Sequence, residues 1–140
     1  MNFDFSALNF ETLDANVNAY PDMFVNVNGV TFSKRVVEDM GYPAYVLCQL
    51  DPQHKVFAIR MCKSNESKGF KFSKPKGEQK GTVSISNKNL LEPLRRCMGD
   101  KWQNDKRYKV TGFWVADAKT MCFDLNEGVQ EEYRSTGKDE

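Results

Sequence analysis

The chain has 140 residues, 40% hydrophobic and 28% charged, with a formal net charge of +1. This length predicts one domain with a hydrophobic core of its own. No apolar run is long enough to cross a bilayer, and residues 1–5 lack the basic and apolar regions of a signal peptide. We therefore expect a cytoplasmic protein with no membrane contact.

The charges are unevenly distributed along the chain. Residues 1–33 contain four acidic residues and no Lys or Arg, whereas residues 55–109 contain fifteen basic and five acidic residues. The segment from Asp117 onward contains seven acidic and three basic residues. A basic middle between acidic ends predicts either an anionic partner for the middle or its neutralisation by the ends of the same chain.

Residues 1–28 form an acidic, Asn-rich N-terminal arm. Its apolar residues share no clean helical face, so we expect a short helix or an irregular segment with Phe side chains that pack on the rest of the domain. Residues 26–29 read as a turn into the first strand. Whether the arm covers its own domain or exchanges with a neighbour stays open, as does the choice between monomer and homodimer.

Residues 29–61 predict the order strand, helix, strand, strand. Ser33 is a good helix N-cap, Val36, Val37 and Met40 follow at helical spacing, and Gly41 ends the helix. Two strands, 45–50 and 56–59, then flank a turn at 51–55.

Residues 62–81 form a basic insertion loop rich in Lys, Ser, Gly and Pro. Within it, Phe70 and Phe72 alternate with Lys71, which predicts a short strand with one buried face.

Residues 82–125 repeat the order strand, helix, strand, strand. Asn89 and Glu92 match a capping box, and Gly99 ends the helix. The hairpin from 108 to 125 turns at Asp117. Because Phe113 and Trp114 break strict alternation, we expect one of them to be exposed and to mark a binding surface. The charged C-terminal tail, 126–140, is expected to fray from about Glu131.

The repeated order predicts an α+β, β-rich fold, a small barrel built from two pseudo-symmetric β-α-β-β halves. The first half resembles the half-barrel of AbrB-like transition-state regulators, through Val30-Thr31-Phe32-Ser33, the helix from Val36 to Gly41 and the hairpin at Asp51. MraZ-type proteins carry two such halves in one chain of similar length. The resemblance implies that two halves of a single chain close one barrel.

The sequence contains no motif for catalysis. Its four Cys residues are widely spaced without a Cys-x-x-Cys pair, and there is a single His. A disulfide framework, a metal site and a cofactor are therefore not expected. Cys62 and His54 are the nearest thiol and imidazole in sequence, with no third group to orient them. We predict a protein that is not an enzyme.

The basic loop is the best functional feature, and it predicts nucleic-acid binding, with DNA as the preferred partner. Lys side chains neutralise phosphates, and an aromatic ring stacks on unpaired bases. Our candidate site residues are Lys68, Phe70, Lys71, Lys74, Lys76, Arg95 and Arg96. Two alternatives remain. The loop is only a soluble insertion that its two Phe residues hold to the core, or the protein is a protein-binding adaptor or inhibitor, encoded on a mobile element.

Overall fold

The computed structural model describes residues 4–13 and 20–132. Nine strands form one antiparallel sheet with the order β5-β3-β4-β8-β7-β1-β2-β6, and β9 pairs with β7. The strands are β1 Asp22–Asn26, β2 Gly29–Phe32, β3 Tyr45–Asp51, β4 Val56–Cys62, β5 Phe70–Lys71, β6 Val83–Ile85, β7 Lys106–Val115, β8 Thr120–Asp124 and β9 Val129–Glu132.

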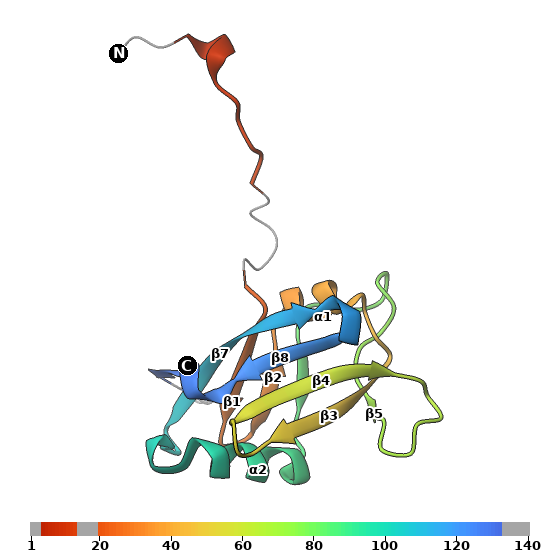
Figure 1. Cartoon of the computed structure of the whole chain (residues 1–140), viewed down its shortest axis with the longest axis vertical. Coiled ribbons are helices and arrows are strands. Elements are labelled where there is room, and N and C mark those ends of the chain that lie inside the picture. Colours follow the sequence, from red (N-terminus) through yellow and green to blue (C-terminus); the bar gives the residue numbers. More distant parts are fainter. Residues whose placement is uncertain (1–3, 14–19, 133–140) are drawn as a thin grey trace, which may run out of the picture.

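The sheet curls around a single apolar core, with β3, β4, β8 and β7 on one side and β1 and β2 behind them (Figure 1). Its two outermost strands, β5 and β6, do not pair with each other in the described part of the chain, so the barrel has an open seam. Phe72, directly after β5, contacts Phe32 of β2 across the core, with ring centroids 5.4 Å apart. The β-rich, barrel-like prediction is confirmed, whereas a pseudo-symmetric relation between two halves is not shown.

Two helices lie at opposite ends of the barrel, α1 (Lys34–Met40) at the end from which the arm leaves and α2 (Lys88–Met98) at the other (Figure 1). Helix α1 ends as predicted at Gly41, whose φ of 78° is the left-handed conformation that glycine adopts freely. Ser33 stands at the N-cap without capping the helix. Its hydroxyl accepts the Asp22 N–H and donates to the Tyr20 carbonyl, which ties the arm to the barrel.

Helix α2 begins earlier than the sequence suggests, and the predicted capping box is wrong. Asn87 is the N-cap, and its side-chain oxygen accepts the Asn89 N–H at 2.8 Å. Glu92 pairs with Arg95 at 3.0 Å and not with the helix start. Leu91, Leu94, Cys97 and Met98 form the buried apolar face of the helix.

Strand β1, which lies between β2 and β7, was not predicted from the sequence. Met23 and Val25 are completely buried, and they alternate with half-buried residues. The predicted turn is present, since the Asn26 side chain accepts the N–H groups of Asn28 and Gly29. The acidic composition of the arm obscures a regular hairpin, whose strands alternate and whose two-residue turn, Val27-Asn28, is closed by the pair Asn26 and Gly29.

Strand β7 changes partners along its length. Its first half pairs with β1 and β9, and residues 112–115 pair with β8. A Cβ at Gly112 would lie 2.6 Å from the ring of Phe123, so only glycine fits this close approach. The expectation of a frayed tail is wrong for Glu131 and Glu132, which belong to β9. Residues 133–140 lie outside the described residues.

Candidate nucleic-acid interface

The basic loop is attached to the core at its centre. Strand β5 pairs with Tyr45 and Val46 of β3, and the Phe72 N–H donates to the Ala44 carbonyl at 2.7 Å. Phe72 is buried, Lys71 is exposed and Phe70 is half-buried. The predicted short strand with one buried face is therefore confirmed, and Phe72 serves as a core anchor.

The lysines of the loop carry uncompensated positive charge. Each is exposed, and none forms an ion pair with any residue in 4–13 or 20–132. Because no carboxylate neutralises them, they remain available to an anionic partner. These residues are Lys63, Lys68, Lys71, Lys74, Lys76 and Lys80.

The basic residues of β7 differ, because the acidic strand β9 lies alongside them. Lys106 pairs with Glu132 at 2.6 Å, and Arg107 pairs with Glu131 at 2.8 Å. Lys109 also approaches Glu131, at 3.6 Å. The hydrogen bond that Lys106 donates to Glu132 raises the pKa of Lys106. Neutralisation by the acidic end of the chain is thus confirmed for β7.

Phe70 lines a pocket of about 230 Å³ between β3, β5 and the first half of α2. The pocket walls are mostly apolar, and they come from Cys48, Leu50, Phe57, Leu90, Pro93 and Leu94. Three amide side chains, Gln49, Asn87 and Asn89, also line the pocket. Burial raises the pKa of the Cys48 thiol to about 11. At neutral pH the thiol is therefore protonated and uncharged, so it lines the pocket as an apolar group and does not act as a nucleophile.

Phe70 was predicted as a site residue from the sequence, whereas the amide side chains that line its pocket were not. Gln49 belongs to β3, Asn87 caps α2 and Asn89 lies in its first turn. Only the tertiary fold brings these separate segments to Phe70. The Asn87-Lys88-Asn89 run was readable as a helix start and carried no sign of a shared pocket.

A second pocket, of about 310 Å³, continues from the first, and Leu50 and Pro93 line both. Lys55 and Arg96 lie at this second pocket with Pro52 and Cys97. Arg96 is exposed, so it adds positive charge at the α2 side of the seam.

The side chain of Arg95 is held in place by neighbouring residues of the protein. Its Nη1 pairs with Glu92, and its guanidinium lies 5.4 Å from the ring centroid of Trp102. Trp102 in turn stacks on Tyr108 at 5.1 Å. The Nε of Arg95 is buried without a hydrogen-bond partner in the described structure. Arg95 thus joins α2 to the residues that follow it.

The seven candidate residues do not form a single cluster. Lys68, Phe70 and Lys71 lie at or beside β5, next to the pocket. Lys74 and Lys76 follow Ser73, which bonds to Pro43 after α1, in a loop at the end of the barrel opposite α2 (Figure 1). Arg95 and Arg96 lie on α2. The pocket that Phe70 shares with α2 lies at the β5 end of the sheet, beside the open seam between β5 and β6.

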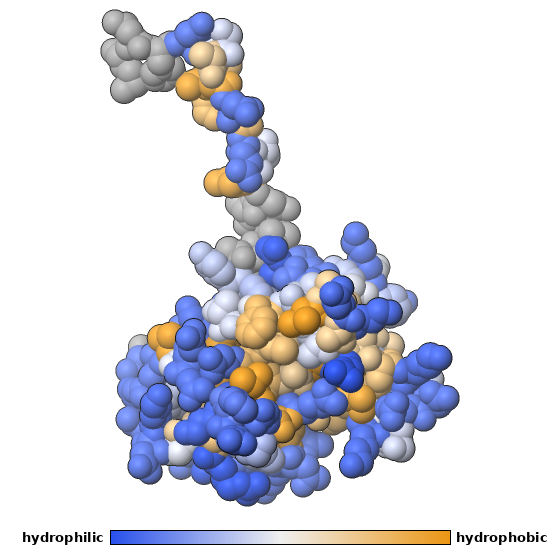
Figure 2. Space-filling model, in the orientation of Figure 1, coloured by the Kyte–Doolittle hydropathy of each residue, from blue (hydrophilic) through white to orange (hydrophobic). Residues whose placement is uncertain are grey.

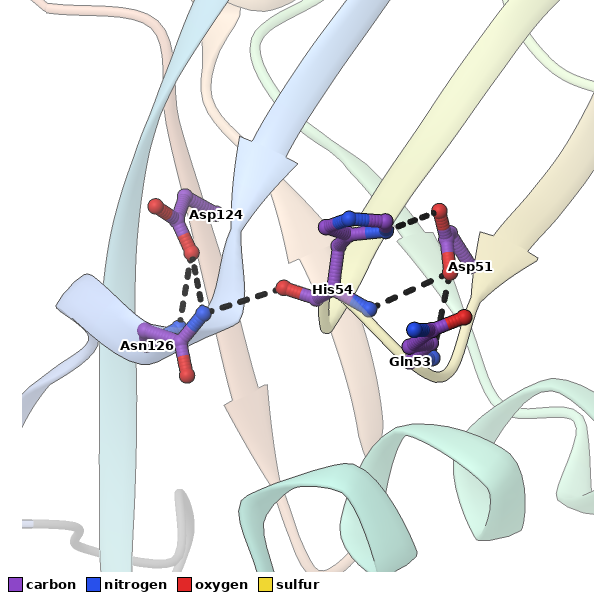
Figure 3. A network of polar contacts seen from close by, with 5 residues as sticks. All are labelled: Asp51, Gln53, His54, Asp124 and Asn126. Atoms are coloured by element: carbon purple, nitrogen blue, oxygen red, sulfur yellow. Dashed lines mark hydrogen bonds and ion pairs between the residues drawn. The ribbon is translucent and has the colours of Figure 1, made fainter.

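The single His takes part in a polar network that joins two turns (Figure 3). Asp51 accepts hydrogen bonds from the backbone of Gln53 and His54, and its other oxygen lies 2.8 Å from the His54 ring. The His54 carbonyl accepts from Asn126, which also donates to Asp124. The bonds from His54 lower the pKa of Asp51. This network stabilises the turn between β3 and β4 and joins it to the residues that follow β8.

The structure does not bring Cys62 to His54. Cys62 ends β4 and His54 precedes it, so about 20 Å of strand separates them. Within residues 4–13 and 20–132, no group of three or more His, Cys, Asp or Glu side chains could hold a metal ion. In the same residues, no helix has the length and apolar character needed to cross a membrane. No protein-family model, no curated protein and no solved structure matches this chain.

Proposed function

We propose that this protein is a non-enzymatic binding protein for single-stranded nucleic acid, DNA in particular, and that the site is the open seam beside β5. One observation supports it most. Exposed lysines without ion pairs adjoin a pocket lined by an aromatic ring and three amides, while the lysines of β7 are neutralised. Phosphate binding needs uncompensated cations, and base binding needs an apolar surface.

In this proposal, Lys68 and Lys71 contact phosphates, and one unstacked base enters the pocket against Phe70. The amides of Gln49, Asn87 and Asn89 can donate to and accept from base edges. A duplex keeps its bases stacked, so it offers no base to this pocket, and single strands should bind more tightly. Lys74 and Lys76 at one end of the seam and Arg96 at the other extend the phosphate path, with Arg95 supporting α2.

Charge reversal tests the lysines. We expect Lys71→Glu with Lys74→Glu to weaken single-strand binding roughly tenfold or more at low salt. Fluorescence anisotropy measures binding, and the melting temperature should not change, because both side chains are exposed and unpaired. The matched control is Lys101→Glu with Lys119→Glu, which alters the net charge equally at exposed positions outside the seam. Equal losses in both double variants would exclude a local site.

Substitution of Phe70 tests the pocket. Phe70→Leu keeps an apolar wall and removes the aromatic ring, so it should weaken single-strand binding by the ~1–3 kcal/mol typical of one stacked base. Duplex binding should change little. An unaltered ratio of single-strand to duplex affinity would remove Phe70 from the interface and leave only the lysines.

We further propose that the chain contains a duplicated β-α-β-β unit of the AbrB-like kind. The elements β2-α1-β3-β4 and β6-α2-β7-β8 have the same order. Strand β2 pairs antiparallel with β6, and β4 pairs antiparallel with β8, as a twofold axis would require. A crystal structure in which the two units superpose would support duplication, and opposite handedness of their crossovers would exclude it.

A protein-binding adaptor or inhibitor is the second candidate function, and the N-terminal arm favours it. Phe5, Phe10 and Leu13 are each more than 70% exposed, beside Asp4 and Glu11. A partner captured by the full chain should then survive salt that strips nucleic acid. Phe5→Ser with Phe10→Ser should abolish that capture, and capture that is unchanged in this variant would exclude the arm.

A further inference from the structure

The outer face of strands β3, β4, β8 and β7 is unusually apolar for a surface. The register places Gln49, Ala58, Cys122 and Phe113 in one row across the strands, and Leu47, Arg60, Thr120 and Val115 in the next. Phe113 is 54% exposed and Val115 36% exposed. Figure 2 shows apolar residues gathered on this side of the barrel. We call these two rows the outer sheet face.

One cation lies within the outer sheet face. Arg60 is exposed, and its Nε donates to the Thr120 hydroxyl at 3.3 Å. Its neighbours across the strands are Leu47 and Thr120. Arg60 has no ion pair with a described residue, so its guanidinium is available to a carboxylate that arrives with apolar neighbours.

The N-terminal arm is chemically complementary to this face. Residues 4–13 are all exposed, which corrects the expectation that the arm's Phe side chains pack on their own domain. Phe5 and Phe10 contact each other, with ring centroids 5.7 Å apart. Asp4 accepts hydrogen bonds from Ser6, so Glu11, between Phe10 and Leu13, is the carboxylate without such a bond in the described arm.

The arm leaves the barrel at the rim of the outer sheet face. Asp22 pairs with Thr111 of β7, and the Gly112 N–H donates to the Pro21 carbonyl at 2.8 Å. Phe113 is the next residue of β7. From there, residues 4–13 extend away from their own barrel (Figure 1). This geometry presents the arm to another molecule at the same edge where the face lies open.

We propose that a second copy of this chain covers the outer sheet face, with the arms exchanged reciprocally in a twofold dimer. Phe5 and Phe10 of each arm pack on Phe113 and Val115 of the other copy, and Glu11 pairs with its Arg60. A twofold interface uses the same surface of both copies, so one arm and one face per chain satisfy both sides. Strand β3 belongs to both surfaces, because Gln49 lies in the outer sheet face and also lines the pocket. The residues that the arm would contact lie on β7 and β4, so the proposal does not depend on nucleic-acid binding.

Sedimentation equilibrium of the full chain across a dilution series tests the assembly. We expect a dimer whose dissociation constant rises at least tenfold with Phe113→Ser and with Phe5→Ser plus Phe10→Ser. Val129→Ser is the matched control, because Val129 is also 54% exposed but lies on β9, outside the face. A monomer at every concentration, or equal weakening by the control, would overturn the proposal.

A charge swap tests the ion pair and the choice of occupant. Arg60→Glu should weaken the dimer, and Glu11→Arg in the same chain should restore it, because the pair is rebuilt with reversed sign. Failure of the second change to restore dimerisation would remove this pair from the proposal. Hydrogen exchange provides the remaining readout: protection of the face by the arm within a monomer would show that the arm closes on its own barrel and would overturn the exchange.

Discussion

The β5 edge and the β9 edge of the sheet have similar basic sequences beside them but different electrostatic outcomes. At the β9 edge, Lys106 faces Glu132 and Arg107 faces Glu131 across the strands. At the β5 edge, Lys71 faces Tyr45 and no acidic strand follows. A cluster of positive residues therefore indicates a binding surface only where the fold supplies no acidic neighbour. Four predictions test this difference between the edges.

The largest expected effect concerns the core anchor of the basic loop. Phe72→Ala should destabilise the protein by about 3 kcal/mol, because Phe72 is 8% exposed and packs on Phe32. Phe70→Ala should cost only about 1 kcal/mol, since Phe70 is partly exposed in its pocket. Urea unfolding measures both. Equal losses for the two variants would contradict the assignment of Phe72 to the core and Phe70 to the site.

Removal of the acidic strand's charge should make the two edges alike. Glu131→Gln with Glu132→Gln leaves the β7 cations without their partners, so they become available to phosphates. Nucleic-acid affinity at low salt should therefore rise several-fold, and its dependence on salt should become steeper. Anisotropy titrations at several salt concentrations measure the slope. Glu127→Gln with Asp117→Asn, an equal charge change at exposed positions, is the control. The same gain in the control would point to net charge alone.

The ion pairs of the β9 edge should contribute modestly to stability. Glu131→Gln should lower the free energy of unfolding by about 0.5–1 kcal/mol at low salt, because surface ion pairs are partly screened. The difference from the parent protein should shrink at high salt. Chemical unfolding at two salt concentrations checks this, and a loss that does not depend on salt would assign the effect to packing.

The smallest effect is a pH dependence at Lys106. Glu132 raises the pKa of Lys106 above its ordinary 10.5, so the stabilisation is complete below that value and is lost as pH rises through the raised pKa. The melting temperatures of the parent and Glu132→Gln should therefore differ at neutral pH and converge in strong alkali. A difference that persists above the raised pKa would mean that the charge on Lys106 is not its source.

Local signals in the sequence predicted most elements and few of their contacts. The spacing of Val36, Val37 and Met40 before Gly41 identified α1 correctly. Helix α2 was found, but its start was placed two residues late, because both Asn87 and Asn89 are acceptable caps. The uneven pair Phe113-Trp114 correctly predicted one exposed aromatic residue, and only the structure shows which one.

The candidate site was predicted less completely than the fold. Composition located the basic loop, and alternation around Lys71 predicted its short strand. Neither could show that Arg95 is engaged by Glu92 and Trp102, or that Ser73, next to Lys74, is bonded to Pro43. Such contacts depend on the three-dimensional positions of residues far apart in sequence, which charge counts along the chain do not contain.

The sequence by itself determined the local features of this protein: the alternation in its strands, the helical spacing of apolar residues, the glycines that end the helices and the basic middle segment. These follow from backbone geometry and solvation within a few residues. Tertiary structure alone decided which charges are neutralised, where Phe70 meets the amides and which sheet face stays open. Those outcomes depend on the order of the strands, because β9 pairs with β7 while β5 ends the sheet beside no acidic strand.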